Sequence, residues 1–469
     1  MTLIVQQKQV KQFSRARLAR DPKFDGLFFT AVKTTGIYCR SICPASAPKE
    51  ENVEYYQTAI SAAKAGFRPC LRCRPDSAPT SSAWHGTDTT VKRAFCLIEE
   101  GIGTEQSIEK ISERLGISSR YLRELFVKKV GVSPQKYISY QRVLLAKKLL
   151  HETSLSMSSV AYSAGFSSVR SFNDSVKNQL KMTPSEIRKK SSKSKLKDNG
   201  IKLKLSYRPP FDWQAMLEFL EKRMIAGVEW QCDGVYGRTL KQDSGAHGYF
   251  EVWHDKTKPV LHLKLVLNQE QDLYPVIQTL RVLFDMDAPI DEIENVIHEV
   301  IGKDIKLHHG LRIPGILGTF EAGVRAILGQ QVSVEQAHRL VQTIVNELGE
   351  PIDIKGKGVL TLFPSPHAVA NSDLGFFKMP QSRKDTLRRL AAHFLTSQNP
   401  DNIDQWLSIK GIGPWTVNYV KLRATNDPDV WLEGDAGVKN ALKLLDDSFE
   451  PGQAAPWRSY LVFQLWHSL

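Results

Sequence analysis

Residues 407–419 read LSIKGIGPWTVNY, and this stretch decides the fold of the C-terminal part of the chain. A Gly-Ile-Gly turn that leads into a helix predicts a tight hairpin, whose exposed backbone N–H groups can hold one DNA phosphate. Asp435 follows 22 residues after Gly413 and is the carboxylate that we expect near the hairpin. Asp429 and Glu433 are nearby carboxylates that we expect on the surface. A Gly-x-Gly turn alone is a weak signal, so its meaning depends on the rest of the chain.

The net positive charge of the chain comes entirely from its front part. Residues 1–200 contain 34 basic and 17 acidic side chains, whereas the remaining residues contain 29 basic and 33 acidic ones. A strongly basic front part favours a nucleic acid as its partner, with a solvated basic surface as the alternative. There is no secretory signal and no stretch of about 18 apolar residues, so we expect a cytoplasmic protein without a membrane span.

Two polar segments, residues 76–90 and 191–200, divide the chain, whose 469 residues at ~100–200 per domain predict several domains. We expect five parts, which are residues 1–78, 85–190, a linker at 191–200, 201–288 and 289–469. Residues 1–78 are loop-rich, residues 85–190 are helical, residues 201–288 mix strands with helices, and residues 289–469 are almost wholly helical. This pattern predicts a multidomain fold that is mainly α with α+β parts.

Four of the six cysteines form two close pairs separated by a loop. The pairs are Cys39 with Cys43 and Cys70 with Cys73. Such a set suits tetrahedral binding of Zn²⁺ by four thiolates, with four buried unligated cysteines or a disulfide as the alternatives. We expect nearby arginines to hold a DNA phosphate beside this site. They are Arg40, Arg68, Arg72 and Arg74. Zn²⁺ with four thiolates carries charge −2, so alkylation of one thiolate would weaken its repulsion of DNA.

Residues 107–128 and 157–177 each predict a helix, a short turn and a second helix. Two such units joined by a long helix would place two recognition helices in successive major grooves. Helix starts are indicated at Ser133 and, with a capping box to Glu186, at Thr183. Arg and Asn suit base edges and Ser suits phosphates, which gives six candidates. They are Ser119, Arg120 and Arg123 in the first unit and Ser168, Arg170 and Asn173 in the second. The alternative is an ordinary helical bundle with surface arginines.

The front part resembles a known family. The segments ARDPKFDGLFFTAVKTTGIYCRSIC and GFRPCLRCRP are similar to the N-terminal domain of Ada-type adaptive-response proteins, over residues 14–78. The resemblance implies one zinc ion on the four cysteines. It further implies that Cys39, in the TTGIYCR context, irreversibly accepts a methyl group from a methyl phosphotriester in DNA. The residues alone do not single out one of the four cysteines.

Residues 90–190 resemble AraC-type DNA-binding domains, through AYSAGFSSVRSFNDSVKNQLKMTPSEIRK at residues 161–189. Ada-type regulators carry the same module after their zinc domain, which implies promoter DNA and RNA polymerase as partners. The chain has no Pro-Cys-His-Arg segment, so we do not expect a second transfer, from O6-methylguanine.

Residues 203–469 look like the AlkA-type 3-methyladenine DNA glycosylases of the helix-hairpin-helix superfamily. The similar segments are YRPPFDWQAMLEFL, FEAGVRAILGQQVSVEQA and AAPWRSYLVFQLW. The resemblance implies hydrolytic release of alkylated bases, with Asp435 stabilising the sugar cation or helping a water to attack. It places in the base pocket Phe219, Gln330, Trp415, Tyr419 and Trp457. Aromatic faces attract a cationic alkylated base. Each aromatic taken alone is more often a core residue than a pocket residue, so its place in the pocket rests on the resemblance.

The same resemblance assigns the duplex and phosphate contacts. Gln331 would be the wedge that enters the duplex, and Gly411 and Gly413 would hold a phosphate, with a monovalent cation allowed at the hairpin. The chain departs from the family at Gln331, where an apolar wedge is common, and at Ala436, where an aromatic often follows the aspartate. Lysine is absent from the position of Trp415, where strand-cutting relatives carry one, so we expect no strand cleavage. The cysteine run of an iron–sulfur cluster is also missing.

Together these features predict a fusion of four folded parts. They are a small zinc domain, a double helix-turn-helix, a β-containing subdomain and an all-helical helix-hairpin-helix glycosylase domain. The fusion would act on double-stranded DNA, as a monomer, both as a methylation-sensing regulator and as a repair enzyme. Two alternatives remain: a transcription regulator with a disabled glycosylase block, and a glycosylase whose front part only supplies affinity for DNA. A base-release assay tests the first alternative, and methyl transfer to Cys39 tests the second.

Overall fold

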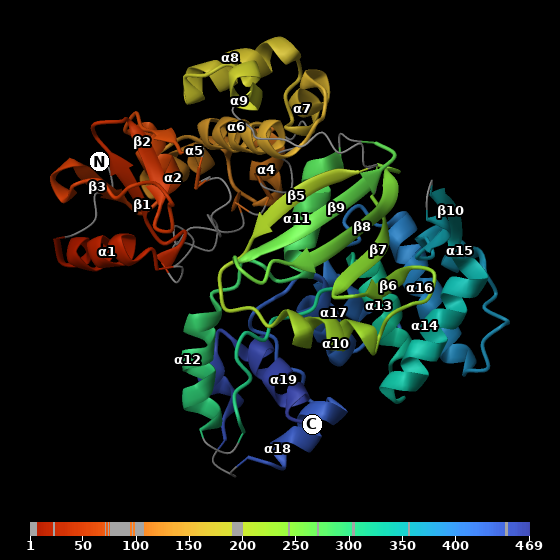
Figure 1. The fold of residues 1–469 in the computed structure, drawn as a ribbon. Helices are drawn as coiled ribbons and strands as arrows, with labels where there is room; N and C mark the ends of the chain where they lie inside the picture. Colours follow the sequence, from red (N-terminus) through yellow and green to blue (C-terminus); the bar gives the residue numbers. More distant parts are fainter. Residues whose placement is uncertain are drawn as a thin grey trace. The chain divides into compact units, whose positions relative to one another are not determined.

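The computed structural model describes residues 7–21, 24–70, 72–73, 75, 94–95, 97–98, 107–189, 200–242, 244–269, 272–302, 305–354, 357–445 and 449–469. The chain divides into two compact units (Figure 1). They are residues 1–208 with 269–278, and residues 209–268 with 279–469. The expected boundaries at residues 76–90 and 191–199 lie outside the described residues.

The first unit begins with a small four-stranded sheet of strand order β3–β1–β2–β4. Strand β1 is antiparallel to β2 and β3, and β2 is parallel to β4. The elements are α1 (Gln7–Ala19), β1 (Phe29–Val32), β2 (Ile37–Arg40), η2 (Glu50–Asn52), β3 (Val53–Tyr56), α2 (Ala59–Lys64) and β4 (Arg68–Pro69). Successive side chains of a strand face opposite ways, so Tyr55 packs with Phe13 of α1 and Tyr56 packs with Ala62 of α2. The expected loop-rich part is therefore a sheet between two helices, whose strands are too short for a visible pattern.

Two helix-turn-helix units follow, as predicted. The helices are α4 (Ile108–Arg114), α5 (Ser119–Val130), α6 (Pro134–Glu152), α7 (Met157–Ser163), α8 (Val169–Leu180) and α9 (Pro184–Lys189). Ser133 caps α6, with its hydroxyl accepting from the Lys136 N–H at 3.3 Å. The predicted capping box is also present: the Glu186 N–H donates to Thr183 Oγ1, and the Thr183 N–H donates to the Glu186 carboxylate. Local capping chemistry therefore sets the start of these helices.

The long helix α6 packs against the cysteine-bearing sheet of the same unit. The buried Lys147 ammonium donates to the carbonyl oxygen of Cys70 at 3.3 Å. One face of α6 also carries Tyr140, whose hydroxyl hydrogen-bonds to that of Tyr38, the residue before Cys39. Because residues seven apart lie on one face of a helix, α6 uses a single stripe for both contacts.

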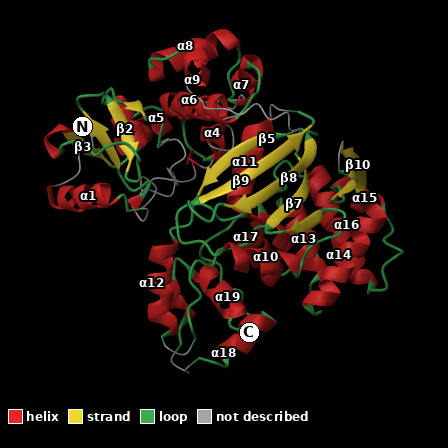
Figure 2. Cartoon of the chain, in the orientation of Figure 1, coloured by secondary structure: helices red, strands yellow, loops and turns green. Residues whose placement is uncertain are grey.

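The second unit combines an antiparallel sheet with helices (Figure 2). Its strands β6 to β9 pair in chain order. They are β6 (Glu229–Cys232), β7 (Val235–Lys241), β8 (His247–His254) and β9 (Val260–Leu267). The helix α10 (Trp213–Glu221) also belongs to the second unit. The strand β5 (Ile201–Ser206) falls within the residues of the first unit, and α11 (Leu273–Leu283) is divided between the two. The predicted strands near residues 202, 249 and 260 are thus confirmed, whereas β6 and β7 were not foreseen.

Residues 289–469 are helical as predicted, apart from one β-hairpin. The helical elements are α12 (Ile290–Ile301), α13 (Thr319–Leu328), α14 (Val334–Leu348), α15 (Pro366–Asn371), α16 (Gln381–Thr396), η6 (Ile403–Ser408), α17 (Pro414–Ala424), α18 (Ala436–Leu442), η7 (Pro451–Ala454) and α19 (Arg458–His467). The hairpin consists of β10 (Glu350–Ile354) and β11 (Gly358–Leu362). Within the part of the chain that the structure describes, no helix has the length and apolarity needed to cross a membrane.

Two apolar cores organise these helices. One contains the fully buried Trp406 and joins α13, α14, α16 and α17. The other contains Tyr460 and joins α12, α18 and α19. Trp415 and Tyr419 of α17 are only partly buried and pack against both cores. These two residues, both predicted for the base pocket, therefore lie where the two cores meet.

Candidate functional site

The carboxylate of Asp435 is held by three N–H donors. Asp435 is the N-cap of α18, where its Oδ1 accepts from the backbone N–H of Val438 at 3.0 Å. The same oxygen accepts from the indole Nε1 of Trp466 at 2.9 Å, and Oδ2 accepts from the indole of Trp415 at 3.3 Å. These donors fix the orientation of a carboxylate that remains partly exposed.

A glycine makes this close approach feasible. A Cβ atom at position 437 would lie 2.8 Å from Cδ1 of Trp466 and 3.2 Å from Oδ1 of Asp435. Any side chain at this position would therefore push the indole away from the carboxylate. The two neighbouring carboxylates differ from Asp435. Asp429 forms an ion pair with Arg458 at 2.7 Å, and Glu433 is exposed, as expected of a surface residue.

An aromatic stack extends from the carboxylate along α17. The rings of Trp415 and Tyr419 stack with centroids 5.2 Å apart and planes 23° apart. The Tyr419 hydroxyl accepts from Nη1 of the buried Arg423 at 3.1 Å. Of the predicted pocket residues, Trp415 thus contacts Asp435 directly, and Tyr419 stacks on Trp415.

A second series of rings returns to the carboxylate. The guanidinium groups of Arg223 and Arg423 lie 3.8 Å and 4.8 Å from the centroid of the Phe219 ring. Phe219 packs on Phe463 at 5.4 Å, and Phe463 packs on Trp466 at 5.0 Å. Burial lowers the pKa of Arg223 to about 10, and the nearby Arg423 adds to that effect. These contacts, together with those of Trp415 and Trp466, form a continuous ring of aromatic and cationic side chains that begins and ends at Asp435.

The sequence predicted one tryptophan at α19, Trp457, for the base pocket and did not identify Trp466. Trp457 is the N-cap of α19, and its ring lies 6.1 Å from that of Tyr460. Trp466 lies nine residues later, about 13.5 Å along a helix, and contacts Asp435. Both belong to the segment AAPWRSYLVFQLW. Only the packing of α19 against α18 shows which end of the helix reaches the carboxylate.

The candidate wedge residues lie in the loop between α13 and α14. Gln331 is exposed and has φ 56°, a left-handed conformation that is uncommon for a residue other than glycine. The side chain of Gln330, expected in the base pocket, donates to the carbonyl of Gly411 at 3.2 Å and to Thr416 Oγ1 at 3.0 Å. Gln330 therefore ties the wedge loop to the hairpin.

The hairpin between η6 and α17 has the predicted form. Gly411 has φ 99°, and a Cβ there would lie 2.0 Å from Oγ1 of Thr386. Gly413 is the N-cap of α17, which begins at Pro414. Because the first N–H groups of a helix lack partners within it, this end of α17 suits a phosphate.

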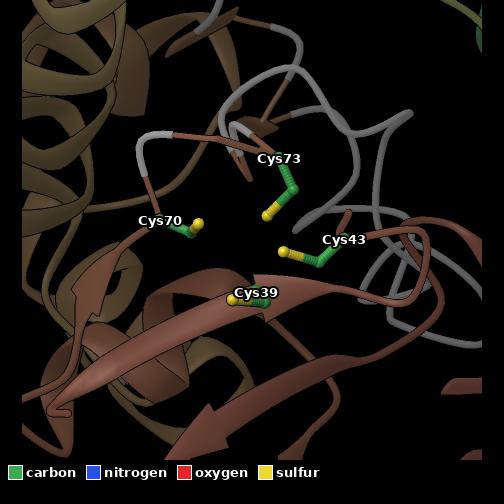
Figure 3. A group of neighbouring side chains, drawn as sticks. All are labelled: Cys39, Cys43, Cys70 and Cys73. Carbon is green, nitrogen blue, oxygen red and sulfur yellow. The ribbon is translucent and has the colours of Figure 1, made fainter. Parts of the chain in front are cut away.

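The four predicted cysteines gather in one place in the first unit (Figure 3). Cys39 lies on β2, and the other three lie on the loops that follow β2 and β4. All four Sγ atoms lie within 4.8 Å of one another. A tetrahedral ion with bonds of about 2.3 Å needs sulfurs roughly 3.8 Å apart, so the cluster fits Zn²⁺. Two backbone N–H groups support the sulfurs, from Arg40 to Cys73 at 3.3 Å and from Arg72 to Cys70 at 3.4 Å.

Burial separates the four thiols into two classes. Cys70 and Cys73 are buried, whereas Cys39 and Cys43 are partly exposed. Hydrogen bonding to Cys39 lowers the pKa of Cys43 to about 7 and also lowers the pKa of Cys70, while the bond to Cys43 raises the pKa of Cys39. A substrate approaching from solvent can therefore reach two of the four sulfurs.

Arg40, which the sequence predicted to contact DNA, is instead buried inside the protein. Its side chain is 5% exposed and forms a buried ion pair with Asp25, which is 1% exposed. Its Nη1 also donates to the carbonyl of Cys73 at 3.2 Å. Arg40 thus supports a ligand loop from inside. Arg68 is partly exposed and Arg72 is exposed, as a DNA contact requires, and Arg74 lies outside the described residues.

The candidate readers lie on α5 and α8. Those that are exposed are Arg120, Arg123, Arg170 and Asn173, while Ser119 and Ser168 are partly exposed. Ser168 is the N-cap of α8, where its hydroxyl accepts from the Ser171 N–H. The equivalent cap of α5 is Ser118, so Ser119 and Ser168 are not equivalent positions.

Comparisons with known proteins match successive parts of the chain. Three families match: the metal binding domain of Ada at residues 12–76, a helix-turn-helix domain at residues 111–190, and the AlkA N-terminal domain at residues 202–318. A protein of Mycobacterium tuberculosis named "Probable bifunctional transcriptional activator/DNA repair enzyme AlkA" is 33% identical over 482 residues, which cover 97% of this chain and 95% of that protein.

Two Escherichia coli proteins each match one part. DNA-3-methyladenine glycosylase 2 is 31% identical over 278 residues, which cover 56% of this chain and 96% of that protein. The bifunctional transcriptional activator/DNA repair enzyme Ada is 34% identical over 173 residues, which cover 36% of this chain and 47% of that protein. The three resemblances inferred from the sequence, to the Ada zinc domain, to the AraC-type helix-turn-helix domain and to AlkA, are thus confirmed.

Proposed function

Because the chain belongs to the family of bifunctional transcriptional activator/DNA repair enzymes, we propose that it acts on alkylated DNA in two ways. Its second unit hydrolyses the glycosidic bond of alkylated bases such as 3-methyladenine. Its first unit takes a methyl group from a methyl phosphotriester onto Cys39, and this transfer increases sequence-specific DNA binding and transcription.

The oriented carboxylate of Asp435 supports base removal. As the glycosidic bond breaks, the electron pair leaves with the base and the sugar becomes cationic at C1′. A fixed carboxylate stabilises that charge, and its water-accessible side lets it orient the attacking water. Trp415 and Tyr419 offer aromatic faces to an alkylated base, which is already cationic and therefore a good leaving group.

The same geometry favours hydrolysis without strand cleavage. Cutting the strand through a Schiff base needs an amine at C1′. The position at which strand-cutting relatives carry a lysine is Trp415, whose indole N–H instead donates to Asp435.

Release of free 3-methyladenine from alkylated duplex DNA tests the first activity. Asp435→Asn keeps the shape and removes the charge, and Glu433→Gln removes an exposed charge two residues away as the matched control. We expect Asp435→Asn to lower the rate about 10²–10³-fold and Glu433→Gln to leave it unchanged. A native chain that releases no base would favour the regulator with a disabled glycosylase block. Equal activity of Asp435→Asn would remove this residue from the mechanism.

The four-cysteine cluster supports the second activity. Bound zinc keeps its ligands as thiolates at neutral pH. The Cys39 sulfur attacks the methyl carbon, a C–S bond forms, and the C–O bond breaks with its electron pair leaving on the phosphodiester. No further reactant is needed, and the thioether product is not reversed. Partial exposure of Cys39 and the family context favour it over the buried Cys70 and Cys73.

Methylation also changes the charge of the site. A neutral thioether in place of a thiolate takes the zinc site from charge −2 to −1, which reduces its repulsion of the DNA backbone. Exposed residues of α5 and α8, such as Arg123 and Arg170, would then read promoter bases.

Peptide mapping by mass spectrometry tests the transfer. Incubation with DNA that carries methyl phosphotriesters should add one methyl group to the peptide containing Cys39. Cys39→Ser should abolish the addition, and Cys232→Ser, which alters an exposed cysteine of the other unit, should not. Methyl found on Cys43 would reassign the acceptor, and no methyl on any cysteine would favour a front part that only supplies DNA affinity.

We propose the remaining assignments on the family context alone. The chain would act as a monomer at the bacterial nucleoid in the cytoplasm and would recruit RNA polymerase at its promoters. A monovalent cation would sit at the hairpin beside Gly411 and Gly413, and no iron–sulfur cluster would be needed.

A further inference from the structure

Helix α16 contacts both DNA-facing loops of the second unit. Near its start, Arg383 donates from Nη2 to the backbone carbonyl of Gln330 in the wedge loop at 2.8 Å. One turn later, Thr386 Oγ1 lies 3.3 Å from the carbonyl oxygen of Lys410 in the hairpin, while its single proton is shared with the nearer carbonyl of Ser382 at 2.8 Å. Arg389 Nη1 donates to that same carbonyl at 3.3 Å. A single rigid helix therefore holds the two loops.

The hydrogen bond from Arg383 restricts the backbone conformation of Gln331, the candidate wedge residue. The carbonyl of Gln330 belongs to the same planar peptide group as the N–H of Gln331. Fixing that plane limits the rotations that place the exposed Gln331, whose φ of 56° is unfavourable for its residue type. Without a partner for the carbonyl, the loop would relax to more ordinary conformations.

The side chain of Gln330 supplies the second attachment of the loop. Its Nε2 donates to the carbonyl of Gly411 and to Thr416 Oγ1. The loop is thus joined to the hairpin directly through Gln330 and indirectly through α16. A shift of the hairpin on its phosphate would be transmitted to the residue that enters the duplex.

We propose that Arg383 is a positioning residue for nucleotide flipping. It holds the Gln330–Gln331 peptide so that Gln331 fills the gap in the duplex when the hairpin grips the backbone. Its guanidinium is partly buried and aimed at a protein carbonyl, which distinguishes this role from a phosphate contact. The inference rests on the base-removal function proposed above.

Arg383→Met tests the proposal, because it removes the donor while retaining most of the stem. Arg388→Met removes the same charge from an exposed position of α16 and is the matched control. The readouts are the fluorescence of 2-aminopurine beside the lesion, the Kd for lesion DNA, and kcat for base release at saturating enzyme.

Relative to Arg388→Met, we expect Arg383→Met to lower the flipped fraction and kcat about tenfold, the size of one lost hydrogen bond to a charged donor. The thermal midpoint and the Kd for undamaged DNA should match those of the control. Arg383→Lys should recover part of the flipping signal, since an ammonium can still donate.

Two outcomes separate this inference from the function on which it rests. If the native chain and both variants release no base, the proposed function fails. If the native chain is active and the two Met variants lose DNA affinity equally without a difference in flipping, Arg383 is a charge contact and the proposal is overturned.

Should Arg383→Met unfold, Gln330→Met in the Arg383→Lys background decides the question. Two attachments of one loop should show coupled losses of flipping. Additive losses would overturn the positioning role.

Discussion

The buried ion pair behind the cysteine cluster should be essential to zinc binding. Arg40 Nε donates to Asp25 Oδ1 at 2.7 Å, and Nη2 donates to the other carboxylate oxygen, so the pair is bidentate. The third nitrogen of the guanidinium donates to the carbonyl of Cys73, a proposed zinc ligand. Asp25→Asn keeps the shape of the side chain but removes the buried carboxylate charge that the guanidinium faces.

The expected magnitude follows from burial. The two side chains are 5% and 1% exposed, and removing one partner of such a pair costs about 3–5 kcal/mol. The exposed pair of Arg120 and Glu124 has side chains that are 90% and 63% exposed, and loss of such a pair costs about 1 kcal/mol or less. Because zinc binding is coupled to folding of its domain, Asp25→Asn should weaken zinc affinity roughly 10²–10³-fold.

A chromogenic zinc chelator added to the full-length chain measures that loss, first in competition and then in a urea titration. Asp25→Asn should release zinc at much lower chelator and urea concentrations than the native chain, and Glu124→Gln should behave as native. Replacing both partners, with Asp25→Leu and Arg40→Met, should recover much of the affinity. Equal zinc release by Asp25→Asn and Glu124→Gln would refute the argument that burial makes this pair important.

Three further predictions concern separate features. Gly437→Ala should lower base release at least tenfold, measured on alkylated DNA, because its Cβ would displace Trp466 from Asp435. Removal of zinc with a strong chelator should abolish methyl transfer while base release continues, since the cysteines and Asp435 belong to different compact units. Burial raises the pKa of Asp285 from its ordinary 3.8 to about 6, so its protonated form favours folding. That contribution is present below about pH 4 and is lost as pH rises through about 6, by about 3 kcal/mol. Asp285→Asn should therefore flatten the pH dependence of the urea midpoint of the second unit, followed by tryptophan fluorescence.

Local chemistry explains which parts of the fold could be predicted. The capping box of Thr183 and Glu186 lies within four residues, and the structure forms it as expected. The pairs of cysteines are also local, and their meeting follows from the demands of one tetrahedral ion. By contrast, β10 and β11 are five residues each and lie among helices, so their pattern did not distinguish them.

The missed parts of the candidate sites depend on contacts between distant residues. Arg40 follows a cysteine in a basic region, which suggested a surface cation, but Asp25 fifteen residues earlier draws it inside. Trp466 and Asp435 are 31 residues apart, and only the packing of α18 on α19 brings them together. Charge counts and motifs record which residues are present, whereas the partner of each is decided by tertiary packing.

The two proposed activities differ in the state of the protein after one reaction. A thioether on Cys39 persists, so the first unit would count phosphotriesters once per chain. Asp435 is regenerated after each hydrolysis, so the second unit would turn over. A chain that is spent as a methyl acceptor should therefore remain a working enzyme, and its glycosidic activity would continue while its charge-altered zinc domain binds promoter DNA more tightly. The separation of the cysteine cluster and the carboxylate into different compact units makes this persistence expected, because neither core contains residues of the other site.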